Sequence, residues 1–499
     1  MATCREGCKK CTAPFLLIVG VILVVLGIAG IYEFPVLINQ QVTQNVMLKE
    51  GTMGYKQWKE PTVPIYMKFY VFNLTNPEEV LAGGKPYVEE IGPYTYREHR
   101  EKVNITFNGN GTVSYRQIRT FHFVREKSVG DDSENFTTAN IPLLTVAEAM
   151  RNQSYFIQLA VEAGLKLTDE KLFISRPVRQ IVWGYHDPLM HLMTLMPGLS
   201  DWFYTDWIGV MMNKNATDDG LYTVYTGEND ISKLGVIDKY NGSKYLNFWT
   251  TKYANMVNGS DGTIAPPSFA VENDTLSYTF QSDICRSVYG VKRGSTKTPQ
   301  GISLHRYIGT ASELANYSIN PDNIGFCLPN KDCLGTGLLW LKSCTNVDYF
   351  PVPVVASFPH FYQGDPKFVE AIGGMHPNAS LHQTEVDVEP ITGLTMGAHK
   401  RVQINVFMTK VKDIGLTENV STLFFPIVWL DESVELDDAT ADLFKNMVYM
   451  PITATTVVQY ACFGLGGALI LISIIIAAVR YKKWKENQSK LESERLLNN

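Results

Sequence analysis

The chain has 499 residues, of which 45% are hydrophobic and 19% charged, and its formal net charge is −6. That length leaves room for more than one domain. Because the mild acidity is spread along the chain without a basic face, the composition argues against nucleic-acid binding.

The first thirteen residues are predicted to form a cytosolic tail that carries Cys4, Cys8 and Cys11. Their C-x3-C-x2-C spacing matches the iron–sulfur motif of radical enzymes that use S-adenosylmethionine. That motif needs a following barrel, whereas here an apolar run begins three residues later. Two alternatives stay open: S-palmitoylation beside basic residues, and plain free thiols.

The first apolar run covers residues 14–31 without a charge, so a transmembrane helix is predicted over residues 14–32. A cleaved signal peptide is the alternative. It is disfavoured because the run is long and no small-x-small cleavage site precedes Glu33.

Residues 33–456 contain no linker or internal repeat and are predicted to form one lumenal or extracellular domain rich in strands. Ile65–Phe72 is aromatic and β-branched, and Val103–Phe123 reads as two strands about an Asn-Gly turn at residues 108–111. Alternation over residues 402–408 predicts a half-buried strand, with Gln403 and Asn405 on its polar face. Another strand is predicted over Leu423–Leu430.

Two helices are expected within that domain. Thr145 and Glu148 have capping-box spacing, and apolar residues continue from there to Leu167. A shorter helix is predicted from Met190 to Leu195, ended by Pro197. An apolar helix of this kind is usually core, and the alternative is an exposed cap that meets a ligand.

Four cysteines lie in this domain, all within one short stretch: Cys285, Cys327, Cys333 and Cys344. An even, clustered set in an oxidising compartment predicts two disulfides, for which three pairings are open. The pairing Cys327–Cys333 nested inside Cys285–Cys344 is favoured, since the GFCLPNKDC segment can fold back through its Pro and Asn.

Asn-x-Ser/Thr sequons are unusually frequent in the same domain, which supports a lumenal location. The predicted N-glycosylation sites are Asn73, Asn104, Asn110, Asn135, Asn152, Asn215, Asn241, Asn258, Asn273, Asn316, Asn378 and Asn419. A further sequon, Asn487, falls in the predicted cytosolic tail and should stay unmodified.

A second uncharged run predicts a transmembrane helix over residues 457–479, followed by a cytosolic tail over 480–499. Basic residues flank both spans on the same side: Arg5, Lys9 and Lys10 before the first, and Arg480, Lys482, Lys483 and Lys485 after the second. The positive-inside rule therefore places both termini in the cytosol. Glycines at 464–467 could let helices pack closely, a weak indication of a homo-oligomer.

The tail ends with a predicted sorting signal. Glu492 stands four residues before the paired Leu496 and Leu497, which is the acidic dileucine pattern that clathrin adaptors bind. The pattern predicts delivery to endosomes and lysosomes, with the plasma membrane as a further location.

Six collinear blocks resemble the class B scavenger receptor family, and the match runs through nearly the whole chain. They are Asn73–Glu98, Trp183–Leu189, Asn255–Gly262, Asp283–Tyr289, Ser357–Asn378 and Asp387–Gly393. The resemblance implies an α+β membrane protein: two terminal transmembrane helices and an ectodomain built on an antiparallel β-barrel with a hydrophobic tunnel and a helical-bundle cap. The nested disulfides match the family arrangement.

The resemblance also implies sites in the cap, which corresponds to residues 141–197. Cations near the apex attract anionic ligands in the family, and Lys166 and Lys171 lie at a comparable place, with solvated surface as the alternative. A lysosomal member carries β-glucocerebrosidase there through a pH-sensing histidine. Here no histidine lies between His122 and His186, which counts against that role.

Two functions therefore fit the sequence. The first is a receptor that binds lipids, lipoproteins or lipid-bearing particles and passes lipid to the membrane. The second is a sorting receptor for a lysosomal protein cargo. An ectoenzyme is disfavoured because no G-x-S-x-G, H-E-x-x-H or phosphate-loop motif occurs, and no cofactor is predicted. His360, His376 and His382 lack metal-ligand spacing and are interpreted as structural.

Overall fold

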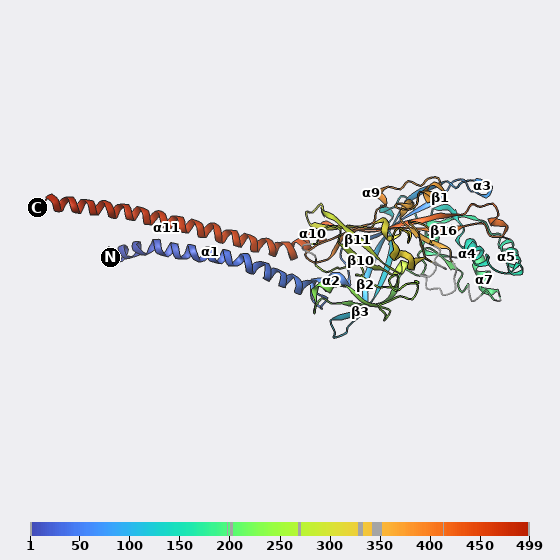
Figure 1. Ribbon diagram of the computed structural model, residues 1–499, viewed down its shortest axis with the longest axis horizontal. Helices are drawn as coiled ribbons and strands as arrows, with labels where there is room; N and C mark the ends of the chain where they lie inside the picture. The colour runs from blue at the N-terminus through green and yellow to red at the C-terminus, as the bar shows by residue number, and fades with distance from the viewer. Residues whose placement is uncertain are drawn as a thin grey trace. The chain divides into compact units, whose positions relative to one another are not determined.

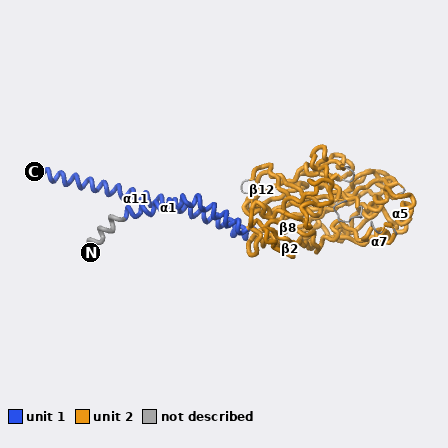
Figure 2. The backbone as a smooth tube through the Cα atoms, turned by 60° about the horizontal axis from the view of Figure 1, so that its bottom comes forward, with its two compact units in different colours: residues 1–45, 441–499 blue, residues 46–440 orange. Residues whose placement is uncertain are grey.

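The computed structural model describes residues 2–196, 198–199, 203–267, 271–327, 333–341, 352–412 and 414–497. The chain divides into two compact units, shown in different colours in Figure 2. Residues 1–45 and 441–499 form one of them, here called the helical unit, and residues 46–440 form the other, the sheet unit.

The helices are α1 (Ala2–Val46), α2 (Met53–Lys59), α3 (Pro77–Leu81), α4 (Ile141–Met150), α5 (Tyr155–Leu167), α6 (Val178–Trp183), α7 (Pro188–Leu195), α8 (Pro366–Glu370), α9 (Ala379–His382), α10 (Asp438–Phe444) and α11 (Met450–Leu497). The strands are β1 (Ile65–Leu74), β2 (Val88–Phe107), β3 (Thr112–Phe123), β4 (Asn135–Ala139), β5 (Phe173–Pro177), β6 (Tyr185–His186), β7 (Trp207–Ile208), β8 (Thr217–Tyr225), β9 (Ile237–Tyr240), β10 (Leu276–Gln281), β11 (Arg286–Lys297), β12 (Ser303–Ile308), β13 (Leu339–Trp340), β14 (Val354–Ser357), β15 (Glu385–Val388), β16 (Thr395–Met408) and β17 (Leu423–Val434). Single turns are η1 (Arg125–Lys127), η2 (Ile231–Lys233), η3 (Ser282–Ile284), η4 (Ala311–Glu313), η5 (Pro321–Phe326), η6 (Pro359–Phe361), η7 (Gly415–Thr417) and η8 (Lys445–Tyr449).

The helical unit is built from α1 and α11, which run side by side (Figure 1). Both are long and apolar enough to cross a membrane, and the predicted spans lie inside them. Glycines set their spacing: a Cβ added to Gly20 would lie 2.9 Å from the carbonyl oxygen of Gly466, and one added to Gly466 equally close to that of Gly20. Ser473 Oγ also donates a hydrogen bond of 2.7 Å to the Ala13 carbonyl. Close packing through small residues is typical of membrane helices.

The sheet unit is organised around one antiparallel, 13-stranded sheet in the order β10-β11-β12-β15-β16-β17-β1-β2-β3-β8-β9, with β13 and β14 attached to β16. The first and last strands of the sequence are neighbours in its middle, paired from Ile65 with Val434 to Val71 with Val428. The sheet is therefore completed only by residues from both ends of the unit.

The two edge strands of this sheet, β9 and β10, are connected through the short segment that contains Gly259 and Ser260. Gly259 accepts a hydrogen bond from the Ile237 N–H of β9, and Ser260 bonds to Tyr278 and Phe280 of β10. The Phe280 ring also contacts Tyr240, with centroids 4.8 Å apart. The sheet thus curls on itself, but among the described residues no ladder joins β9 to β10. The antiparallel β-barrel that the family resemblance implies is therefore not found as a closed barrel among the described residues.

Several predicted elements are confirmed. The segment at 65–72 is in β1, the Asn-Gly turn joins β2 to β3 with Gly109 and Gly111 at positive φ, and the second helix is α7, capped by Asp187. These elements follow local rules: β-branched and aromatic residues favour strands, and a tight hairpin needs residues that tolerate positive φ.

The prediction of one helix from Thr145 to Leu167 is wrong. Asn140 caps α4 earlier by accepting the Leu143 N–H, with Pro142 in the first turn, so Thr145 lies inside the helix. Its hydroxyl instead donates to the Ile141 carbonyl at 2.7 Å. The chain then breaks at residues 151–154, and a second helix, α5, follows. Helices α4, α5 and α7 contact one another at one end of the sheet unit (Figure 1).

Candidate functional site

A cavity of about 860 Å³ lies inside the sheet unit. Its walls come from β1, β14, β16 and β17 and from the segments around residues 204–214 and 280–288. The side chains lining it are mostly apolar and include Met67, Ile208, Phe248, Leu339, Val354, Val402, Ile404 and Leu430. A space of this size and lining suits an apolar ligand.

Strand β16 shows how the sequence builds this wall. Val402 and Ile404 face the cavity and keep some accessible surface, while the alternate residues Gln403 and Asn405 are fully buried. Gln403 Nε2 donates to Asn405 Oδ1, and Asn405 Nδ2 donates to the Val355 carbonyl, so both amides are satisfied. The prediction that these amides lie on a solvated face of a half-buried strand is wrong, because both are buried: Gln403 Oε1 accepts the His360 N–H at 2.7 Å, and Asn405 Nδ2 also donates to Ser357 Oγ at 3.0 Å.

One part of the cavity lining is charged. Lys400 and Arg100 both pair with Glu432, at 3.3 and 2.8 Å. Lys214 lies 2.9 Å from Asp283, which Arg119 also contacts. Burial alone would raise the pKa of Glu432, but Lys400 and Arg100 outweigh it and lower that pKa to about 2. This part of the lining therefore stays ionised at neutral and at mildly acidic pH.

A second buried ion pair lies deeper in the sheet unit. The Lys102 side chain is inaccessible to solvent, and its Nζ lies 3.1 Å from Asp261 Oδ2. Asp261 also accepts the Tyr115 hydroxyl at 2.7 Å and the Thr263 backbone N–H at 2.9 Å. Trp58 and Tyr115 present their rings to the ammonium. Lys102 and Asp261 compensate each other's charge. Burying either charge alone would cost a large desolvation free energy.

The histidines predicted to be structural take part in a cluster that the sequence does not reveal. His360 and His382 are both buried, and their side chains lie with that of Glu90 within 4.8 Å of one another, as ligands of a metal ion could. Their rings are stacked, however, with centroids 4.4 Å apart and an interplanar angle of 9°. A ring nitrogen binds a metal along a lone pair in the ring plane, and two stacked parallel planes share no point. The geometry therefore opposes joint coordination of one metal ion. His376 contributes a backbone N–H to His360.

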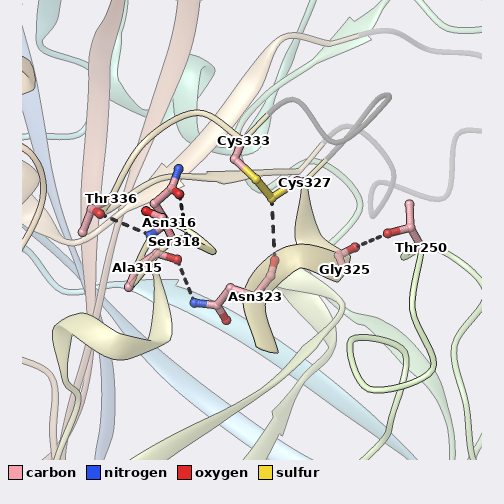
Figure 3. Close-up of a disulfide and its surroundings, with 9 residues drawn as sticks. All are labelled: Thr250, Ala315, Asn316, Ser318, Asn323, Gly325, Cys327, Cys333 and Thr336. Carbon is pink, nitrogen blue, oxygen red and sulfur yellow. Dashed lines mark hydrogen bonds between the residues drawn. A yellow bond between two sulfur atoms is a disulfide. The ribbon is translucent and has the colours of Figure 1, made fainter. Parts of the chain in front are cut away.

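The cysteine cluster is only partly within the described residues. Cys327 is bonded to Cys333, beside a turn held by hydrogen bonds from Asn323 to Ala315 and from Thr250 to Gly325 (Figure 3). Cys285 is also disulfide-bonded, whereas Cys344 lies outside the described residues.

All twelve predicted glycosylation sites are accessible to some degree. Asn73, Asn258 and Asn316 are half-buried, and the other nine are exposed. Asn378 caps α9 through its side-chain oxygen, which accepts the Ser380 N–H, so its nitrogen stays available for a glycan.

The predicted ligand-binding lysines lie at the surface. Lys166, at the end of α5, pairs with Glu162 at 3.5 Å, and Lys171 is exposed. Exposed apolar side chains are more prominent on this helix. Tyr155, Phe156 and Leu159, here called the α5 surface, are 59%, 79% and 52% exposed. A contiguous patch of large exposed apolar side chains marks an interaction site in many soluble domains.

The predicted terminal signals lie in the long helices. Glu492 and Leu496 are exposed on α11, and the Leu497 side chain lies outside the described residues. Cys4, Cys8 and Cys11 are in α1, but their side chains also lie outside the described part. Among the glycines of α11, Gly466 packs on α1, whereas Gly464 and Gly467 face open space.

Comparison with known proteins decides the family. The model of the CD36 family matches residues 18–477. The chain belongs to the CD36 family. This confirms the class B scavenger receptor resemblance, and together with the two long apolar helices it shows that this CD36-family member is a two-span membrane protein.

Two kinds of relative are similar to this CD36-family member. Human lysosome membrane protein 2 is 41% identical over 436 residues, covering 87% of both chains. Bovine scavenger receptor class B member 1 is 34% identical over 458 residues, covering 92% of this chain and 87% of the relative. The Chinese hamster (Cricetulus griseus) protein of the same name is 35% identical over 459 residues. The relatives are thus named as membrane proteins and receptors.

Proposed function

We propose that this CD36-family member binds lipids or lipid-bearing particles and moves lipid through the sheet unit to the membrane. The observation that carries the proposal is the cavity of about 860 Å³ with its largely apolar lining. A sixteen-carbon chain crossing water would expose methylenes at about 0.8 kcal/mol each, or roughly 12 kcal/mol in total. An apolar conduit removes most of that cost. The cavity would be the middle section of a tunnel, with α4, α5 and α7 as its cap.

The charged part of the lining suits the polar head of an amphiphile. Lys400 and Glu432 meet the cavity close to the apolar residues Val402 and Leu430 on the same two strands. A fatty acid, sterol or phospholipid places its chain against apolar side chains and its head against polar ones. The lining therefore supports lipid as the ligand class.

This proposal can be tested by mass spectrometry of the lipid that co-purifies with the full-length chain. Acyl or sterol lipid should accompany the wild-type protein and should fall when the cavity is filled by larger side chains. If the filled variant retains the same lipid in the same amount, the bound lipid surrounds the membrane helices instead, and the transport proposal fails.

The two termini are proposed to be cytosolic, as the basic flanks indicate, with the cysteines of the first tail as sites of palmitoylation. In that orientation the dileucine at Leu496 is available to clathrin adaptors, and Leu496 is 81% exposed. The lysosomal name of the human relative supports the same destination, endosomes and lysosomes, with a pool at the plasma membrane.

Replacing the dileucine should redirect the protein. In a Leu496→Ala/Leu497→Ala variant we expect most of the protein to move from lysosomes to the cell surface, because the adaptor loses its apolar contact while the sheet unit is untouched. Surface biotinylation and imaging measure the shift. Leu491→Ala is the matched control, since Leu491 is an exposed leucine of the same tail outside the signal. An unchanged lysosomal pool in the double variant would show that the dileucine does not direct the protein to lysosomes.

A second function, sorting of a lysosomal protein cargo, is supported by the α5 surface. Three large apolar side chains on one short helix are costly to leave in water, and a folded partner with an apolar face would cover them. The sequon at Asn152 lies just before this helix, so a glycan there would border the contact.

Charge on the α5 surface should weaken cargo binding. We expect Phe156→Asp/Leu159→Asp to weaken it by about thirtyfold, since an interface anchor is worth about 2 kcal/mol. Retention of lysosomal hydrolases by cells that lack the endogenous protein is the readout, with lipid content measured alongside. Leu276→Asp, at an exposed leucine of β10, is the control. Full retention in the double variant would leave the cargo function without support.

A further inference from the structure

His360 and His382 hold a short segment of chain against the sheet unit. His382 is the last residue of α9, and its Nδ1 accepts the backbone N–H of Asn378 at 3.0 Å. The Nδ1 of His360 accepts the backbone N–H of His376, also at 3.0 Å. Both acceptors are fully or nearly fully buried, at 3% and 4% exposed. Two imidazoles thus bind the first part of the segment His376–His382.

These hydrogen bonds fix where each ring carries its proton. A neutral imidazole has one N–H and one lone pair, and here both Nδ1 atoms supply the lone pair. The proton therefore sits on Nε2 of each ring. In His360 that Nε2 lies 2.5 Å from the carboxylate of Glu90, which also accepts the Trp429 indole N–H at 2.7 Å. The arrangement is complete with both rings neutral.

Protonation is incompatible with this arrangement. A second proton on either ring must go to Nδ1. Nδ1 then has no lone pair to accept the backbone N–H, and the two N–H groups point at each other. The backbone hydrogen bond is then lost, and a cation stacks on the neighbouring ring. Acid therefore breaks the contacts that hold the segment.

The charged groups that act on His382 come from two strands, β2 and β16. Glu90 of β2 favours a protonated ring, Arg401 of β16 opposes it, and on β17 Trp429 is neutral, stacked on Tyr70 of β1. Burial, together with His360 and Arg401, lowers the pKa of His382 to about 4, although Glu90 opposes the shift. The side chain of His376 is exposed.

We propose that His360 and His382 form an acid-operated latch, which holds His376–His382 on the sheet unit at neutral pH and releases it in acid. The latch borders the cavity, because Phe358 and Thr384, each two residues from one of the histidines, line its wall. Release therefore loosens the cavity wall beside these two residues. The latch itself does not depend on the ligand, so it can be tested separately from lipid transport.

Hydrogen exchange of the full-length chain in detergent tests the latch, with rates corrected for the intrinsic effect of pH. The folded pKa of His382 is about 4 and that of a free histidine about 6.5. By linkage the opening equilibrium of His376–His382 should increase about a hundredfold between about pH 7 and pH 4. In His382→Asn this contribution of His382 should be lost and the increase should be much smaller, because the asparagine oxygen can accept the Asn378 N–H at any pH.

Two further variants keep the test decisive. His376→Ala should respond to pH as the wild type does, since only its backbone takes part. Glu90→Gln should make the increase at pH 4 larger than in the wild type, because without this carboxylate the folded pKa of His382 falls further below that of a free histidine. Exchange in β1 must stay unchanged in each variant, which excludes global unfolding. Wild-type exchange that does not respond to pH would overturn the latch. An undiminished response in His382→Asn would do so too, as would protection gained on adding zinc alone at neutral pH.

Discussion

Replacing Asp261 by asparagine is expected to lower the free energy of unfolding of the sheet unit by about 3–5 kcal/mol. The variant keeps the size of the side chain and the acceptor for the Thr263 N–H, but removes the charge that compensates Lys102. Burial lowers the pKa of Lys102 and Asp261 opposes that effect, so without Asp261 the ammonium is left buried and uncompensated. Pulse proteolysis of the full-length chain across a urea series measures the loss.

The pH dependence of this effect has a definite sign. Burial would raise the pKa of Asp261, but Lys102 and the hydrogen bonds outweigh it and lower that pKa to about 2. A carboxylate with a lowered pKa contributes its stability above its unfolded pKa, about 3.9, and loses it as pH falls through the folded one. The stability that Asp261 contributes to the wild type should thus be the same at pH 7 and at pH 5, and should fall only as the pH drops below about 4.

Two other variants check the reason for the loss. Asp218 pairs with Arg116 at 2.6 Å, but both side chains are more than a third exposed. Asp218→Asn should therefore cost about 1 kcal/mol or less. In Lys102→Met/Asp261→Asn neither charge of this buried pair remains, and most of the loss should be recovered. Equal losses in Asp261→Asn and Asp218→Asn would show that burial does not set the strength of the pair.

Filling the cavity should displace its lipid. In Val402→Trp/Ile404→Trp two indoles replace aliphatic side chains on the cavity wall. Each methylene that leaves the apolar lining costs about 0.8 kcal/mol, so displacing three weakens binding by about 2.4 kcal/mol, or roughly fiftyfold. Lipid mass spectrometry on the purified chain and uptake of a fluorescent fatty acid or sterol by cells provide the two measurements.

The control for this variant is Leu276→Trp, which adds the same indole at an exposed position of β10. It should retain wild-type lipid content and uptake. The melting temperature of the filled variant must stay close to that of the wild type, since the indoles enter existing space. Normal uptake by a filled, folded protein would mean that lipid does not pass through this cavity.

Elements specified by neighbouring residues could be predicted from the sequence. The apolar runs within α1 and α11, the β1 strand and the Asn-Gly hairpin depend on composition over a few residues, and all are present. The α4 boundary was also local, in Asn140 and Pro142, but the capping pattern at Thr145 obscured it.

Features that depend on distant residues could not be predicted. Glu90 and His360 are 270 positions apart, and Lys102 and Thr263 are 161 apart, so no local pattern links either pair. Gln403 and Asn405 illustrate the same limit, because alternation looks identical whether the polar face meets water or other protein groups. Their partners His360 and Ser357 are more than forty positions away along the chain.

The pairing of β1 with β17 also constrains how the protein is made. Lys68 and its partner Glu435 are separated by 367 residues, and ribosomes add about 5–20 residues per second. A nascent β1 therefore waits roughly 20–70 s before its final neighbour has been synthesised. During that interval the edge of β1 that later pairs with β17 lacks its partner strand, and an unpaired strand edge favours misassembly of the unfinished chain.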